Sequence, residues 1–271
     1  MVGGYFFIAL GVVSCALLWL SKYQPDHVMF PVRMADKETF ESDFAPYRDQ
    51  FGLIQNNPGG SSGNGLRYTS EYYILKFRYG LLTKDDTLQF ESIVRRCFAE
   101  PGLLNRSPKD KSPQKFDDYV AVSTASLIFE LLLANDIKTY GLKHRWYYNN
   151  SKLPNLKFKD KWGAWFGKDQ GLIAHFYYAD QDTPSWFKTI AWTVNILLCA
   201  YTAKDSQDEW VLSGHQIIAY EWSHDRTWVQ DKVAGIWRKR FRKQWGVDGM
   251  SVLLEKYFGH KHPLAKYAVD I

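Results

Sequence analysis

The chain has 271 residues, 17% of them aromatic, which is ample material for one large core and excludes a disordered protein. Its 34 basic and 29 acidic residues give a net charge of +5, too mild to make nucleic acid an expected partner. Three cysteines make no disulfide framework, and Cys97 and Cys199 suit buried apolar positions.

The first twenty residues are the clearest signal in the chain. No side chain from residue 2 to residue 20 is charged, and Lys22 is the first that is. As a helix this run would reach roughly 28 Å, close to the ~30 Å hydrocarbon core of a bilayer. Trp19, Lys22 and Tyr23 are typical of the membrane interface. We expect residues 1–22 to be an uncleaved membrane anchor of unknown orientation. A cleaved signal peptide and a buried or virion-internal helix are the alternatives.

Hydrophobic periodicity and helix-start residues predict a mainly α fold behind this anchor. A lead-in segment at 23–59 precedes a helical domain at 60–271. Helices are expected near residues 37–51, 68–80, 83–99, 117–134, 183–202, 206–222, 225–246 and 250–258. Long loops at 56–65 and 100–116 separate some of them, residues 140–182 include one possible short strand at 174–178, and a polar tail ends the chain. Alternating short and long connections favour antiparallel helical hairpins.

Several helix starts carry recognisable capping residues. Thr83 and Asp86 have the spacing of a capping box. Asp117 or Asp118 is placed to cap the apolar helix that follows, and Asp225 the helix that ends at Gly246.

The first candidate site is the loop at 56–65 and the helix start after it, which carry Asn64, Arg67 and Tyr72. Asn and Arg side chains at a helix N-terminus can bind sugar hydroxyls or an anion. The alternative is a flexible loop before a helix whose tyrosines pack inward.

The second candidate site joins Arg106, on the basic loop, to the paired acids Asp117 and Asp118. One of two adjacent carboxylates can act as a general acid or base while the other caps the helix. Asp118 is the expected acid or base and Asp117 the cap. Capping together with the helix dipole is the alternative for both residues.

The third candidate site is an aromatic set around His175, which would line a glycan cleft or fill a wide helical core. The histidines lack metal-ligand spacing and no nucleotide-binding motif is present, so neither a metal nor a cofactor is expected. The basic run at 238–243 either contacts anionic lipid or nucleic acid, or is a solvated helix face.

Three stretches carry a resemblance: GNGLRYTSEY at 63–72, EPGLLNRSP at 100–108 and DDY at 117–119. Together they resemble uncharacterised proteins encoded by tailed bacteriophages. The helix-hairpin order is also similar to α/α-toroid enzymes, which act on glycans. The toroid resemblance implies a partial α/α-toroid in which acids at helix starts, here Asp117 and Asp118, line the cleft.

Two functions follow as hypotheses. The first is a membrane-anchored helical protein that engages a glycan, as a glycoside hydrolase or polysaccharide lyase. The second is a non-catalytic bacteriophage virion or host-interaction protein, with self-association or virion contacts as its partners.

Overall fold

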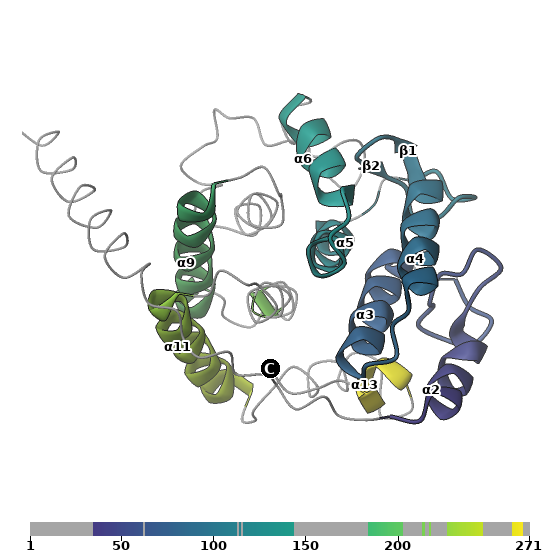
Figure 1. Ribbon diagram of the computed structural model, residues 1–271, viewed down its shortest axis with the longest axis horizontal. Coiled ribbons are helices and arrows are strands. Elements are labelled where there is room, and N and C mark those ends of the chain that lie inside the picture. Colours follow the sequence, from purple (N-terminus) through teal and green to yellow (C-terminus); the bar gives the residue numbers. More distant parts are fainter. Residues whose placement is uncertain are drawn as a thin grey trace, which may run out of the picture.

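The computed structural model describes residues 35–61, 63–112, 114, 116–143, 184–202, 213, 214, 217, 227–245 and 262–267. Over these residues the protein is mainly helical, as the sequence predicts, with one two-stranded antiparallel sheet (Figure 1). None of the helices in this part of the chain combines the length and apolarity needed to cross a bilayer. The predicted anchor lies outside the described residues.

The first described helix, α2 (Lys37–Phe44), is shorter than the predicted 37–51. The Asp36 carboxylate caps it by accepting a hydrogen bond from the Thr39 backbone N–H at 2.7 Å. A single 3₁₀ turn, η1 (Ala45–Tyr47), follows. The helix ends here because Pro46 has no N–H to continue the ladder, and the Asp49 carboxylate then accepts backbone hydrogen bonds that hold a turn.

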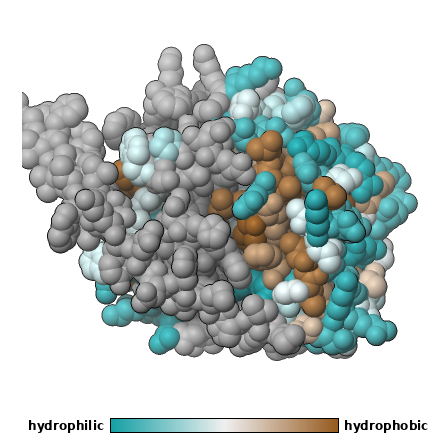
Figure 2. Space-filling view, viewed as in Figure 1, coloured by the Kyte–Doolittle hydropathy of each residue, from teal (hydrophilic) through white to brown (hydrophobic). Residues whose placement is uncertain are grey.

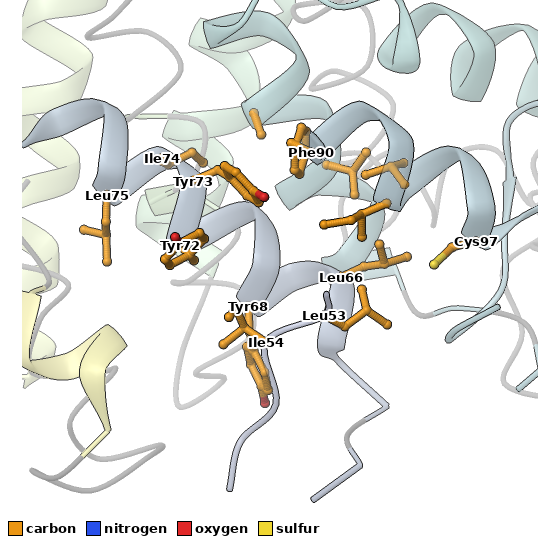
Figure 3. Close-up of a cluster of buried hydrophobic side chains, with 14 of the residues drawn as sticks. Leu53, Ile54, Leu66, Tyr68, Tyr72, Tyr73, Ile74, Leu75, Phe90 and Cys97 are labelled. Carbon is orange, nitrogen blue, oxygen red and sulfur yellow. The ribbon is translucent and has the colours of Figure 1, made fainter. Parts of the chain in front are cut away.

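The central helix is α3 (Gly65–Arg78), in which every residue except Phe77 is buried. It ends two residues before Gly80, close to the predicted end, and the φ of +68° at Gly80 is readily adopted by glycine. The helix α4 (Lys84–Cys97) begins with the predicted Thr83–Asp86 capping box. Figure 3 shows side chains of α3 and α4 converging, and the rings of Tyr73 and Phe90 lie 5.2 Å apart.

The predicted loop at 100–116 contains a small hairpin instead, made by β1 (Phe98–Glu100) and β2 (Leu103–Leu104). Gly102 turns the chain with a φ of +90°. Strands of two or three residues are too short to show the alternation of apolar and polar residues by which a strand is predicted.

The predicted helix at 117–134 is shorter in the structure, as α5 (Phe116–Ile128), and a second helix that was not predicted, α6 (Leu133–Lys143), follows it. Between them Glu130 has a left-handed φ of +56°. The Ser126 hydroxyl donates to the Leu131 carbonyl at 2.6 Å and accepts from the Ala134 N–H at 3.1 Å, so it bridges the break and caps α6.

The C-terminal third contains α9 (Ser185–Thr202), as predicted, then α11 (Trp228–Trp245) and α13 (Pro263–Tyr267). Thr227 and Gln230 form reciprocal hydrogen bonds at the start of α11, where Asp225 was the expected cap. The expected polar tail includes α13, whose Leu264 and Tyr267 are buried. The predicted strand at 174–178 and the helix at 250–258 lie outside the described residues, as does most of the helix at 206–222.

Among the described residues, the buried hydrophobic side chains form two cores. The larger gathers side chains from α2 to α6 and α13, and it includes Phe40, Phe44 and Leu53 of the predicted lead-in segment. The smaller lies between α9 and α11, and Leu127 of α5 packs against it. In Figure 1 the helices follow an arc from α2 and α4, through α3, α5 and α6, to α9 and α11.

Candidate functional site

The start of α3 brings together four of the residues that the sequence singled out: Asn64, Arg67, Arg106 and Asp118. Asn64 is the N-cap residue of α3, but its side chain makes no capping hydrogen bond. Its amide instead lies 3.5 Å from the Tyr68 hydroxyl. The cap comes from another helix: Oδ1 of Asp118, on α5, accepts a hydrogen bond from the Arg67 backbone N–H at 2.8 Å.

Asp118 is fully buried, with 0% of its surface exposed. The N–H of the third residue of a helix is the donor that an N-cap side chain ordinarily satisfies. Asp118 therefore performs for α3 the role expected of Asp117 in its own helix. The side chain of Asp117 lies outside the described residues.

Arg67 forms a buried ion pair one turn along the same helix. Its Nε lies 2.9 Å from Oε1 of Glu71, and its guanidinium carbon lies 6.0 Å from the centre of the Tyr68 ring. Arg67 has no exposed surface, so its guanidinium is paired with Glu71 inside the protein and does not face solvent. The bond from the Arg67 backbone N–H to Asp118 joins the start of α3 to α5, whereas the ion pair with Glu71 lies within α3.

Arg106 reaches the same place from the loop after β2. A Cβ atom built on Gly63 would lie 3.4 Å from the Arg106 guanidinium carbon, so the guanidinium lies against the loop just before Asn64. The Tyr119 hydroxyl accepts the Leu104 N–H at 3.0 Å and holds β2 against α5. Gly63, Asn64 and Arg106 are only half-buried. They are the part of this site that still contacts solvent.

Tyr72 belongs to a different cluster, which the sequence analysis did not find. Its hydroxyl donates to Oε2 of Glu41 at 2.7 Å. The buried Lys76 ammonium lies 2.5 Å from the other Glu41 oxygen and 2.6 Å from Oδ1 of Asp86. The Arg48 guanidinium carbon lies 5.1 Å from the centre of the Tyr72 ring. Tyr72 is thus a core residue whose hydroxyl donates to a carboxylate of α2, on the side of α3 that faces that helix.

The acids in this cluster are held ionised. Burial raises the pKa of Glu41, but hydrogen bonds from Lys76 and Tyr72 outweigh burial and leave that pKa below its usual value. Burial likewise raises the pKa of Asp86, and the bonds from Lys76 and Thr83 more than offset it. Burial raises the pKa of Tyr72 well above its usual value, which keeps the hydroxyl protonated as a donor.

His175 lies outside the described residues, but another histidine, His262, stabilises the packing near α3. His262 accepts the Leu264 N–H on Nδ1 at 3.1 Å, so its Nε2, 3.2 Å from the Gln55 carbonyl, carries the proton. Burial lowers the pKa of His262 and favours this neutral form. It ties α13 to the segment before α3, with its ring 4.6 Å from that of Tyr47.

Within the part of the chain that the structure describes, no group of His, Cys, Asp or Glu side chains is arranged to hold a metal ion. Comparison of the chain with protein-family models, characterised proteins and solved structures finds no match in any of the three.

Proposed function

We propose that this protein is a membrane-anchored helical domain that binds a glycan and does not cleave it. The observation that carries the proposal is the position of Asp118. A general acid or base must come within hydrogen-bond reach of the bond it acts on. A carboxylate with no exposed surface, bonded to the Arg67 amide, is committed to the fold.

Asn64 and Arg106 are the proposed ligand contacts. They are half-buried, they come from two separate loops, and the contact of Arg106 with Gly63 brings them close together. An amide offers both donors and acceptors to sugar hydroxyls, and a guanidinium matches a carboxylate with two parallel hydrogen bonds. This pair favours glycans that carry acidic sugars.

The membrane part of the proposal rests on the uncharged run at residues 2–20. Carbonate extraction of membranes from cells expressing the full chain tests it. Retention in the pellet supports the anchor, and release of the intact chain into the soluble fraction contradicts it.

A glycan array probed with the detergent-solubilised full chain tests the binding site. We expect Arg106→Ala to weaken binding about tenfold or more, the loss of a charge-assisted contact, with unchanged melting. Arg95→Ala, which removes an exposed arginine paired with Glu91 and Asp136, is the matched control for the loss of an arginine. Absence of any bound glycan contradicts the proposal. So does glycan cleavage that a folded Asp118→Asn variant loses, because that result shows an enzyme.

A further inference from the structure

The net positive charge of this chain comes from one helix. Between Trp228 and Trp245, α11 has six basic residues and one acidic residue, Asp231. Taking these from the 34 basic and 29 acidic residues of the whole chain leaves 28 of each sign. The chain without α11 is therefore neutral, and the helix accounts for the entire net charge of +5.

The two faces of α11 differ sharply. One face lies in the smaller core, where Val233, Trp237 and Phe241 are buried. The opposite face is a stripe of exposed residues spaced three or four apart, and so aligned along the helix. Its members are Trp228, Lys232, Gly235, Lys239, Arg242 and Lys243.

The stripe begins with an exposed aromatic ring. Trp228 is 40% exposed, and the Lys232 ammonium lies 5.6 Å from the centre of its ring. Among the described helices in Figure 1, α11 lies on the side opposite α2 and α4, and Figure 2 shows hydrophilic side chains on that side. A flat surface could therefore meet the stripe without displacing the helices of the larger core.

We propose that this stripe docks on the anionic headgroups of a lipid bilayer, with Trp228 at the headgroup level and the lysines on phosphates and carboxylates. Basic helices with an exposed tryptophan are typical of such surfaces. Nucleic acid is less well matched because the rest of the chain has no net charge with which to extend the contact along a polyanion. The inference builds on the proposed anchor, which would keep α11 close to the membrane.

Lysine acetylation of the full chain, followed by mass spectrometry, tests this surface. The protein is reconstituted in nanodiscs of phosphatidylcholine alone or with phosphatidylserine. We expect acetylation of Lys232, Lys239 and Lys243 to slow about tenfold in the anionic discs, and the rates to recover in high salt. The exposed loop residues Lys109 and Lys111 should react equally in both discs.

Charge-reversal variants distinguish binding at the α11 stripe from attraction to the membrane that depends only on the net charge of the protein. The Lys239→Glu/Lys243→Glu variant should lose the slowing at Lys232, whereas Lys109→Glu/Lys111→Glu, with the same change in net charge, should keep it. Equal rates in the two discs overturn the proposal. Inorganic phosphate or a single-stranded oligonucleotide is also added to the protein in neutral discs. If either slows acetylation of these lysines as much as the anionic discs do, the proposal is overturned.

The same samples distinguish failure of the anchor from failure of this surface. Recovery of the chain with neutral discs reports the anchor alone. If the chain is not retained there, flotation with vesicles is measured instead. Flotation with anionic but not neutral vesicles supports docking by α11, provided that Lys239→Glu/Lys243→Glu abolishes it. No flotation with either kind of vesicle contradicts it.

Discussion

Oδ1 of Asp118 and the backbone nitrogen of Arg67 lie 2.8 Å apart, although 51 residues separate them in the chain. Through this bond α5 caps the buried helix α3. The cap works between helices, so it stabilises the packing of α3 on α5 as well as the end of α3. It also explains why the N-cap residue itself, Asn64, makes no capping bond.

Replacing Asp118 with alanine should lower the free energy of unfolding by about 2 kcal/mol, because the Arg67 N–H loses its acceptor inside the protein. Denaturant titration followed by circular dichroism measures it. Asp85→Ala, at an exposed position in the first turn of α4, is the control and should cost under ~1 kcal/mol. Equal small effects would show that the cap contributes little.

Gly102→Ala should destabilise the protein by about 3 kcal/mol or more. A Cβ at this position, where φ is +90°, would lie 2.2 Å from the Asp136 carbonyl oxygen and 2.6 Å from Cβ of Tyr140. Gly59 also has a positive φ, but a Cβ there meets nothing within 4 Å. Gly59→Ala should therefore cost only ~1 kcal/mol, the strain of a left-handed backbone. The difference in thermal melting between the two variants reports the contact of the β1–β2 turn with α6.

Lys76→Met should cost about 2–3 kcal/mol at pH 7, because it leaves Glu41 and Asp86 without their shared cation. The pKa values of both acids are lowered in the folded protein, so the stability they supply is present at neutral pH. It is lost as the pH falls below about 4 and the acids protonate. The difference between the two proteins should therefore shrink at acid pH. Urea unfolding at several pH values tests this.

The exposed Lys84→Met variant controls for the loss of a lysine as such and should change stability by under ~0.5 kcal/mol. A cost at Lys76 that stays the same from neutral to acid pH would show that packing of the lysine stem, and not the ion pairs, accounts for it.

Cys97 should resist alkylation in the folded protein. It has no exposed surface, and burial raises the pKa of its thiol to about 12, so almost no thiolate is present near pH 8. Iodoacetamide labelling read by peptide mass spectrometry should modify Cys97 only after denaturant is added. Rapid labelling without denaturant would mean that the end of α4 opens readily.

Local patterns in the sequence determined the features whose partners are close along the chain. Thr83 and Asp86 are three residues apart, so the capping box that begins α4 could be read directly. The end of α3 just before Gly80 and the bounds of α9 were predicted from local signals of the same kind. Pro46 was a local signal for the end of α2, and the prediction of a helix to residue 51 overlooked it.

Only the tertiary structure decided the features whose partners are distant. α13 has just five residues, too few to be stable alone, and it forms because Tyr267 packs 4.8 Å from Phe40 and donates to Asp43 at 2.6 Å. The break between α5 and α6 likewise depends on packing and on the Ser126 hydroxyl.

The same distinction applies to the candidate site. Composition and spacing marked Asn64, Arg67, Arg106 and Asp118 as polar residues at helix starts and loops, and the fold brings them together. Their roles depend on burial, which no local pattern reports. Asp118 and Arg67 are enclosed and stabilise the helix packing, whereas Asn64 and Arg106 still reach solvent. The sequence specifies the chemistry of each side chain, but whether a ligand can contact that side chain depends on the residues that pack over it in the tertiary structure.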